Sequence, residues 1–419
     1  MERVLVKGGE CLSGEVHIGG SKNAALPLLF AGILTGERCV FSNLPRVSDV
    51  LHALEILRSM GARICFFANQ DVSVDYGSVR SMPPPLSLTS SIRGSTYLMG
   101  AMLGRFGEAR FAKAGGCDFG TRPIDQHLAG FARLGAVIKE EEGSLYIHAQ
   151  GGLKGASVTL AMPSVGATAN LLLAAATAQG ETVIHNAAAE PHVAALAEFL
   201  TSAGASVHGI GTSTVRVVGV PRLHGVNHRI IPDMIEAGTY LCMGVACGGE
   251  VRVADVTPAH LGALLDVFRT MGVGVEVGED TITVKAPGHY FNTVVQTGPY
   301  PGFPTDLHPQ LTALFCIGGR ARGVGIVREC IWQNRFRYVS GLQSMGASIA
   351  ISGDSATVLP ARLHAASICS PDLRGGAALL LAALAASGES EIRNAATIAR
   401  GYDHLEEKLL GLGAHVKVD

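Results

Sequence analysis

Hydrophobic and polar positions along this chain follow one pattern that returns six times. In stretches such as residues 261–268, apolar side chains recur three and four positions apart, which predicts an amphipathic helix with one buried face. Each such stretch closes on a short phrase in which an apolar residue precedes a glycine that is followed by Ala or Val. The closing glycines are 67 to 74 residues apart and stand at Gly61, Gly135, Gly204, Gly272, Gly346 and Gly413. This regular spacing predicts six copies of one structural repeat.

Each predicted repeat also has a glycine upstream of the amphipathic stretch, at Gly36, Gly107, Gly180, Gly249, Gly323 and Gly388. The residues after it, such as 182–185, are rich in β-branched side chains and lead into a polar turn, so we expect a strand there. The closing glycine should end the helix, and an alternating run such as 347–351 should begin the next strand. Before the upstream glycine lies a helix that is apolar on all sides, as in residues 171–178 and 377–386. Each repeat therefore combines strands with two helices, one of them almost entirely buried.

The all-apolar helices need burial on every side, which favours two globular domains of three repeats each over an open solenoid. We expect an α/β (α+β) fold in which domain I spans residues 21–230 and domain II combines residues 1–20 with residues 231–419. The chain would cross between the domains at Gly19-Gly20 and in the stretch 227–232. Residues 4–17 would then complete the second domain.

Composition and charge restrict the kind of partner. Hydrophobic residues make up 47% of the 419 residues and charged residues 16%, which excludes a disordered chain. The net charge of −2 gives no basic field for a nucleic acid or an anionic membrane, so any site that binds an anion must be local. No apolar stretch reaches the roughly 20 residues of a spanning helix and no secretory signal stands at the N-terminus, which predicts a cytoplasmic protein.

The residues that usually hold metals and cofactors lack the required spacing. Nine cysteines without a Cys-x-x-Cys pair argue against a disulfide framework and a thiolate metal site, and the fifteen histidines show no ligand spacing. A Walker motif and a dinucleotide fingerprint are also absent from the sequence, so we expect no ATP, NAD or metal. The cysteines in apolar runs should be core residues, namely Cys39, Cys65, Cys242, Cys247 and Cys316.

One repeat breaks the pattern by its length. The second repeat has 28 residues between its two glycines, against 23 to 25 in the others, and the surplus lies in residues 113–125. This stretch places Cys117 among glycines and between Lys113 and Arg122, and nearby cations lower the pKa of a thiol and favour its reactive thiolate. By length alone the stretch could equally be a neutral surface insertion. Its composition favours a catalytic loop.

Motifs from one end of the chain to the other carry a resemblance to a known family. They are Gly-Ser-Lys-Asn at 20–23, Gly-Gly-Cys at 115–117 with Gly-Thr-Arg-Pro-Ile-Asp at 120–125, and the stretches 163–168, 232–239, 303–306, 334–336, 372–374 and 400–402. In this order they resemble the UDP-N-acetylglucosamine enolpyruvyl transferases. The resemblance implies two inside-out α/β barrel domains with the active site in the cleft between them. It also implies transfer of the enolpyruvyl group of phosphoenolpyruvate to the sugar 3-hydroxyl, the first committed step of peptidoglycan synthesis.

The resemblance further implies roles for individual residues. Cys117 matches the loop cysteine that donates a proton, forms an adduct with phosphoenolpyruvate and reacts with fosfomycin, while Asp306 matches the carboxylate that takes the hydroxyl proton, and Lys22 is the third catalytic match. Asp306 alone would more often cap a helix. The matches for phosphoenolpyruvate are Lys22, Asn23, Arg93, Arg122, Arg335, Arg374 and Arg400, with Asp372 near them. The matches for the UDP-sugar are Asn23, Arg93, Pro123, Ile124, Asp125, Gln126, Ser164, Val165, Gly166, Asp306 and Ile331, supported by Glu190.

The chain also departs from the family pattern. Thr397 and Ala399 stand where the family usually has His and Asp, Met234 stands where it usually has Arg, and the family usually has Gln near His308. Two alternatives stay open beside the main expectation. One is the sister transferase that modifies shikimate 3-phosphate, which would not need the Gly-Gly-Cys loop. The other is a catalytically idle paralogue that binds a UDP-sugar, which the changes at Thr397 and Ala399 would suit.

Overall fold

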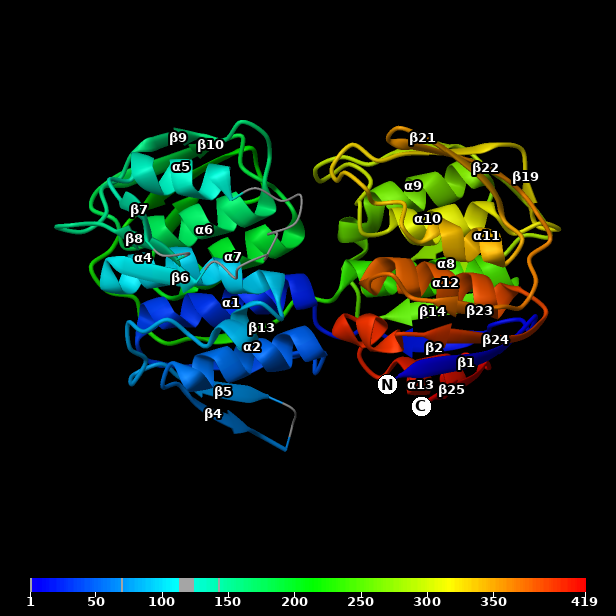
Figure 1. Ribbon diagram of the computed structural model, residues 1–419, viewed down its shortest axis with the longest axis horizontal. Helices are drawn as coiled ribbons and strands as arrows, with labels where there is room; N and C mark the ends of the chain where they lie inside the picture. The colour runs from blue at the N-terminus through cyan, green and yellow to red at the C-terminus, as the bar shows by residue number, and fades with distance from the viewer. Residues whose placement is uncertain (1, 69–70, 113–123, 142–143) are drawn as a thin grey trace. The chain divides into compact units, whose positions relative to one another are not determined.

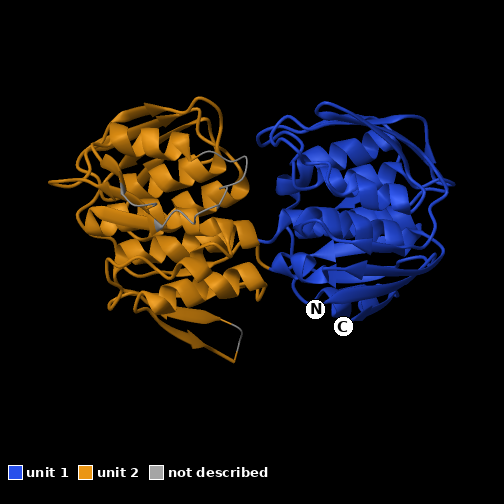
Figure 2. Ribbon diagram, viewed as in Figure 1, with its two compact units in different colours: residues 1–19, 232–419 blue, residues 20–231 orange. Residues whose placement is uncertain are grey.

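The protein is described here by a computed structural model that covers residues 2–68, 71–112, 124–141 and 144–419 (Figure 1). These residues divide into two compact units (Figure 2). Unit 1 combines Met1–Gly19 with Pro232–Asp419, and unit 2 spans Gly20–Ile231. The borders of the units lie one residue from the expected limits of the two domains.

Each unit has three buried helices that pack against one another. They are α1 (Lys22–Thr35), α4 (Leu98–Phe106) and α6 (Val165–Ala175) in unit 2, and α8 (Met234–Cys247), α10 (His308–Phe315) and α12 (Leu373–Ala385) in unit 1. Nearly every residue of these helices is buried, as their all-apolar sequences predict. Small residues allow the helices to approach closely, since a Cβ at Gly100 of α4 would lie 2.4 Å from the backbone oxygen of Asn170 in α6. The two all-apolar helices predicted at 171–178 and 377–386 begin four to six residues earlier than expected, because Ser164 and Asp372 cap them at those points.

Sheets and amphipathic helices surround the buried helices of each unit (Figure 1). The second helix of each repeat is α2 (Ser48–Ser59), α5 (Asp125–Arg133), α7 (Pro191–Ser202), α9 (Gly262–Met271), α11 (Val339–Ser344) or α13 (Leu405–Gly411). Short helical turns form α3 (Leu86–Thr89), η1 (Arg93–Tyr97), η2 (Pro258–Leu261) and η3 (Ala395–Arg400). The buried helices thus form the interior, which is the reverse of a barrel with strands inside.

The strands repeat one sheet plan. Unit 2 has the orders β13 (Asn227–Arg229), β3 (Arg38–Ser42), β5 (Val72–Asp75), β4 (Arg63–Phe66); β6 (Glu108–Ala112), β8 (Ser144–His148), β7 (Val137–Glu141); and β11 (Ser206–His208), β12 (Thr214–Val218), β10 (Glu181–His185), β9 (Ser157–Thr159). Unit 1 has the orders β15 (Gly274–Val277), β16 (Thr281–Lys285), β14 (Glu250–Ala254), β2 (Gly14–His17); β18 (Val294–Gln296), β20 (Gly325–Arg328), β22 (Ser355–Leu359), β21 (Ser348–Ser352); and β23 (Ser367–Cys369), β24 (Gly388–Arg393), β1 (Arg3–Gly8), β25 (His415–Val418). A pair, β17 (Tyr290–Phe291) and β19 (Ala321–Arg322), is added. Each four-stranded sheet has one parallel pair at one edge and is otherwise antiparallel.

Pairings between distant segments close each unit. In unit 2 the last strand, β13, pairs in parallel with the first, β3, so that Asn227 lies opposite Val40. In unit 1 the N-terminal strand β1 lies between β24 and β25, and β2 pairs with β14. The first seventeen residues therefore belong to the sheets of unit 1.

The closing glycines have one structural role in all six repeats. Each has a positive φ, from +82° at Gly272 to +106° at Gly204, and lies just beyond the second helix of its repeat. The N–H of the next residue then donates to the carbonyl five positions back, for example Ala62 to Leu57 at 3.0 Å and Ala205 to Leu200 at 2.9 Å. This is the Schellman motif, in which glycine is favoured because its backbone enters the left-handed region without strain. The predicted helix ends are confirmed.

One expectation about the core is wrong. Cys65 lies in an apolar run, but its side chain is exposed because β4 is the edge strand of its sheet and packs on one neighbour alone. The other four cysteines expected in the core, Cys39, Cys242, Cys247 and Cys316, are buried. In the part of the chain that the structure describes, no helix is long and apolar enough to cross a membrane.

Candidate active site

Several of the predicted site residues lie in the first turns of buried helices. The side chains of Ser21, Ser164, Asp233 and Asp372 accept backbone N–H groups and cap α1, α6, α8 and α12. Because each cap begins its helix, the residues directly after it occupy the first turn, which are Lys22 and Asn23, Val165 and Gly166, Met234, and Arg374. The N-terminal end of a helix carries partial positive charge and free N–H groups, so it attracts anions. The repeated fold thus presents several ends that suit phosphate and carboxylate groups.

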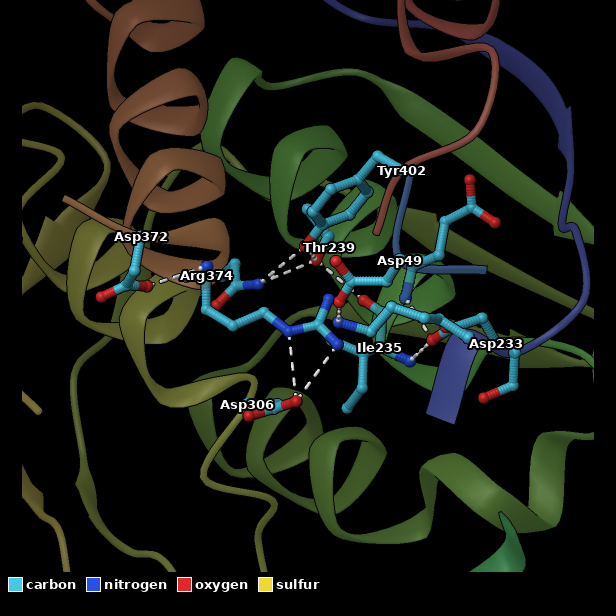
Figure 3. Close-up of polar contacts among 12 residues, drawn as sticks. Asp49, Asp233, Ile235, Thr239, Asp306, Asp372, Arg374 and Tyr402 are labelled. Atoms are coloured by element: carbon cyan, nitrogen blue, oxygen red, sulfur yellow. Dashed lines mark hydrogen bonds and ion pairs between the residues drawn. The ribbon is translucent and has the colours of Figure 1, made fainter. Parts of the chain in front are cut away.

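Asp306 is held by two arginines in unit 1, Arg335 and Arg374. Figure 3 shows the contact with Arg374. Arg335 Nη2 donates to Oδ1 at 2.8 Å, and Arg374 Nε donates to Oδ2 at 3.1 Å, with Nη2 of Arg374 also 3.1 Å from that oxygen. The N-cap position of α10 belongs to Leu307, so the carboxylate of Asp306 does not cap this helix. Asp306 is therefore oriented by charge-assisted hydrogen bonds, which are stronger and shorter than neutral ones.

Arg374 is the more deeply buried of the two arginines, with 3% of its side chain exposed. Burial would lower its pKa, but Asp306, Tyr402 and Asp233 outweigh that effect and raise the pKa of Arg374. Tyr402 in turn lies 2.9 Å from Thr239 Oγ1 and accepts a hydrogen bond from Gln310 Nε2 at 3.2 Å. These contacts connect α8, α10 and α12, so the guanidinium is fixed by all three buried helices of unit 1.

Glu329 is a buried residue in contact with Thr305, the neighbour of Asp306, and it was not identified from the sequence. Glu329 accepts a hydrogen bond from Thr305, the neighbour of Asp306, at 2.8 Å. His308 Nε2 lies 3.3 Å from the same carboxylate oxygen, and Tyr338 Oη lies 3.2 Å from His308 Nδ1. Burial lowers the pKa of His308 to about 3, so its ring is neutral at neutral pH. The sequence signal for a role of Glu329 was weak, because this residue directly follows a strand, where polar turn residues are common.

Ile331 and Arg400 are two further predicted site residues of unit 1. Ile331 donates its backbone N–H to Glu329 at 2.7 Å. Arg400 ends η3 and is half-buried. The departure at Thr397 lies in η3 as well, and its hydroxyl is 2.6 Å from the hydroxyl of Ser370, two residues before Asp372. Thr397 therefore links η3 to the segment that leads into α12.

Lys22 has a carboxylate partner in unit 2. Its Nζ lies 3.3 Å from Oδ2 of Asp49, and 11% and 6% of the two side chains are exposed. Asp49 stands in the first turn of α2 and was not predicted as a site residue. Asn23 follows Lys22 in α1, and Arg93 begins η1 with an exposed side chain. Asp49 thus balances the charge of the half-buried Lys22 and holds its side chain in position.

The predicted nucleotide residues of unit 2 lie close to one another where α5 meets the first turn of α6. Ile124 and Asp125 begin α5, and Gln126 accepts a hydrogen bond from the backbone N–H of Met162 at 3.3 Å, just before the cap Ser164. A Cβ at Gly166 would lie 3.0 Å from the ring of His127, so a larger residue there would require this ring to shift. His127 lies 2.9 Å from Asn170 of α6, and burial lowers its pKa to about 4. Gln126 and Ser164–Gly166 thus belong to one local assembly.

Three predicted residues, Cys117, Arg122 and Pro123, lie outside the described residues. Glu190 occupies the N-cap position of α7 without a side-chain capping bond and is half-buried. Within the described ranges, no group of three or more His, Cys, Asp or Glu residues could hold a metal ion. The structure thus brings Asp306, Arg335 and Arg374 together in unit 1, and Lys22 and Asp49 in unit 2.

Known proteins resemble this chain along its whole length. The family model of EPSP synthase (3-phosphoshikimate 1-carboxyvinyltransferase) matches residues 6–409. The chain is 43% identical to UDP-N-acetylglucosamine 1-carboxyvinyltransferase 2 of Bacillus subtilis (strain 168) over 418 residues, which cover 99% of this chain and 96% of that protein. It is 45% identical to the protein of the same name from Latilactobacillus sakei over 420 residues, covering 100% of this chain and 99% of that protein.

Solved structures agree with these relatives. The enolpyruvyl transferase NikO from Streptomyces tendae matches with a TM-score of 0.89 and 28% identity, over 99% of this chain and 98% of that chain. EPSP synthase from Acinetobacter baumannii matches at 19% identity with a TM-score of 0.75, covering 100% of both chains, and shows the fold alone. The matched structures have the inside-out α/β architecture of two similar domains. The chain therefore belongs to the EPSP synthase family, the enolpyruvyl transferases.

Proposed function

We propose that this protein transfers the enolpyruvyl group of phosphoenolpyruvate to the 3-hydroxyl of UDP-N-acetylglucosamine and releases phosphate. The observation that carries the proposal is the 43 to 45% identity, over nearly the full length of both chains, to proteins named for this activity. The oriented Asp306 and the anion-suited helix ends support it. The reaction would be the first committed step of peptidoglycan synthesis and would take place in the cytoplasm.

The reaction needs an acid, a base and positive charge. A proton adds to C3 of the enol while the sugar oxygen bonds to C2 and loses its own proton, which gives a tetrahedral ketal. A proton then leaves C3 again, and the C2–O bond to phosphate breaks, so that an enol ether and inorganic phosphate are formed. General acid–base groups in such sites contribute about 10²–10⁴-fold to the rate.

The chain's own residues suit these tasks. Asp306 would take the sugar hydroxyl proton, because Arg335 and Arg374 orient its carboxylate. Cys117 would supply the proton to C3. Lys22, Arg122 and Arg400 would bind the phosphate and carboxylate of phosphoenolpyruvate, with Asn23, Arg93, Arg335 and Arg374 around them. Residues 123–126 and 164–166 with Ile331 would bind the nucleotide.

The deciding experiment measures phosphate release from phosphoenolpyruvate with UDP-N-acetylglucosamine, with shikimate 3-phosphate and with no acceptor. We expect release with the UDP-sugar alone. Release with shikimate 3-phosphate would instead favour the sister transferase, whose name the family model carries. Protein that binds the UDP-sugar but releases no phosphate would be the idle paralogue.

The role of Cys117 has its own test. We predict that Cys117→Asp keeps turnover but is no longer inactivated by fosfomycin, because a carboxyl group donates a proton yet attacks an epoxide poorly. The measurement is residual phosphate release after incubation with the drug. Cys330→Ser, a change at an exposed cysteine, is the control that should stay sensitive. Full fosfomycin sensitivity of Cys117→Asp would contradict the assignment of Cys117 as the residue that reacts with the drug.

A further inference from the structure

Glu329 occupies a position that has a different conformation in the four other repeats that the structure describes there. In these repeats the residue after the strand that follows the upstream glycine is Asn or Asp with φ between +56° and +57°. These residues are Asn43, Asn186, Asp255 and Asn394. The three asparagines donate side-chain hydrogen bonds of 2.9 to 3.1 Å to a backbone carbonyl at the end of the neighbouring strand. Glu329 follows β20 at the same place but lacks the left-handed conformation. The fifth repeat therefore lacks this turn, and the side chain at this position makes different contacts.

The carboxylate of Glu329 instead connects two other segments. Its Oε2 accepts the hydroxyl proton of Thr305 at 2.8 Å, and its Oε1 accepts the backbone N–H groups of Ile331 at 2.7 Å and Trp332 at 2.9 Å. The residue is 2% exposed. Since the neighbouring His308 ring is neutral, the carboxylate is held by hydrogen bonds from these segments rather than by a paired cation. A buried carboxylate with three hydrogen bonds fixes its partners firmly.

The two connected segments both carry predicted site residues. Thr305 precedes Asp306, so the hydroxyl bond fixes the backbone from which the base projects. Residues 331–335 contain Ile331 and also Arg335, which donates to Asp306 from the other side. One carboxylate thus determines where the base stands relative to the arginine that orients it.

We propose that Glu329, acting through Thr305, is a positioning residue for Asp306 and for the nucleotide contact at Ile331. This inference rests on the proposed function, because it assigns Glu329 to the reaction that Asp306 serves. It predicts separate effects on turnover and on binding. Loss of the Thr305 bond should lower kcat, whereas loss of the whole carboxylate should lower kcat and also raise KM for the UDP-sugar.

The test compares Thr305→Val, Thr305→Ser, Glu329→Ala and Glu329→Gln by steady-state phosphate release. Thr305→Val keeps the shape and removes the hydroxyl, so we expect kcat to fall about 10-fold or more with KM for the UDP-sugar within about twofold, since small misplacements of reacting groups are costly. Thr305→Ser restores the hydroxyl and should recover most of kcat. Glu329→Gln can still accept the two N–H groups and donate to Thr305, so it should resemble the wild type far more than Glu329→Ala does.

Two controls separate positioning from general damage. Thr35→Val removes another buried threonine hydroxyl, which donates to the carbonyl of Gly32 at 2.8 Å near the far end of α1, and should leave kcat unchanged. Trp332 is the single tryptophan of the chain, so acrylamide quenching of its fluorescence reports on the segment that Glu329 holds. Quenching should increase in Glu329→Ala and stay as in the wild type in Thr305→Val.

The outcomes are distinct. Two results would overturn the inference and leave the proposed function intact, provided that the wild type is active. One is full turnover in Thr305→Val, and the other is an equal loss of kcat in Thr305→Val and Thr35→Val. An inactive wild type would overturn the proposed function, and the inference with it. A drop in kcat for Thr305→Val that Thr305→Ser reverses would support both.

Discussion

Two guanidinium groups on one carboxylate are the main feature of the site at the scale of single residues. Arg335 and Arg374 approach different oxygens of Asp306, so the carboxylate has one preferred orientation. Arg374 also depends on this contact, because a buried guanidinium needs a compensating negative charge nearby. Asp306 should therefore matter both for activity and for the stability of unit 1.

The change Asp306→Asn separates charge from shape. We expect kcat for phosphate release to fall at least about 100-fold, because an amide cannot act as a general base. The free energy of unfolding should fall by about 1–3 kcal/mol, since Arg374 loses a charged partner. Asp266→Asn is the matched control, because Asp266 pairs with Arg269 on the surface at 2.8 Å, and its loss should change neither quantity measurably. An active and fully stable Asp306→Asn protein would contradict the assignment of Asp306 as the base.

A second residue gives unit 1 a pH dependence. Burial raises the pKa of Glu236 to about 7, although Lys408 at 2.7 Å and the N–H of Gly19 at 3.0 Å partly oppose the shift. A carboxyl group whose pKa is higher in the folded than in the unfolded state binds protons more tightly when folded. Its contribution to stability is fully present below the unfolded pKa of 4.5 and is lost as the pH rises through about 7.

We therefore predict that Glu236→Gln makes the stability of the protein less dependent on pH between 5 and 8. The relevant quantity is the difference in the free energy of unfolding between variant and wild type, measured by urea titration at several pH values. This difference should change by up to about 3 kcal/mol in favour of the variant as the pH rises. His127 and His308 titrate with lowered pKa in both proteins, so their effect cancels. A constant difference across this range would refute the raised pKa.

At the scale of helices and strands, the N-terminal ends of the buried helices and the C-terminal ends of the amphipathic helices have different roles. The N-terminal ends of α1, α6, α8 and α12 are capped by Ser or Asp and carry the predicted site residues. The C-terminal ends of the amphipathic helices carry the closing glycines, which only reverse the chain. The glycine phrase is therefore structural, whereas the short polar phrases at the caps contain residues that we predict to be functional.

Two of the closing glycines allow the conformational cost to be separated from a clash. In Gly272→Ala the new Cβ would meet nothing within 4 Å, so we expect a loss of about 1–2 kcal/mol in the free energy of unfolding from the left-handed conformation alone. In Gly61→Ala the Cβ would also lie 2.6 Å from the backbone oxygen of Ser78, so the loss should be larger. Urea unfolding measures both. Equal losses in the two variants would show that the backbone near Ser78 yields without cost.

At the scale of the whole molecule, each unit has its own core and closes its own sheets. Unit 2 is one continuous segment whose first and last strands pair. Unit 1 is discontinuous, but the N–H of Asp233 donates to the carbonyl of Gly19 at 2.9 Å, so its two pieces meet where the chain leaves and returns. Residues 19 and 233 of unit 1 are therefore adjacent in space, although the whole sequence of unit 2 lies between them.

We predict that both units fold when expressed separately. Residues 20–231 need no further change, and residues 1–19 joined by a short glycine linker to residues 232–419 should restore unit 1. Each should unfold in one cooperative transition, followed by circular dichroism and differential scanning calorimetry. A version of unit 1 without residues 1–17 is the control and should fail, because β1 lies between β24 and β25. Broad, non-cooperative melting of residues 20–231 would show that unit 2 depends on unit 1.

The sequence by itself determined the six repeats, the helix ends and most of the candidate residues. These features are local: a left-handed glycine after a helix is required wherever Gly272 or Gly413 stands, and an all-apolar helix must be buried in any fold. The chemistry of the short motifs is local as well, so Lys22, Asp306 and Arg374 could be named before their partners were known.

The tertiary structure alone decided which residues meet. Asp49 pairs with Lys22, and Glu329 accepts a hydrogen bond from Thr305, because helices and turns from different parts of the chain pack together. Sequence spacing holds no record of such pairs, since the separation of 24 residues between Thr305 and Glu329 corresponds to no helical or strand period. Cys65 illustrates the same limit, because an apolar run does not state whether its strand lies at the edge or the centre of a sheet. Packing fixes contacts that local periodicity cannot encode.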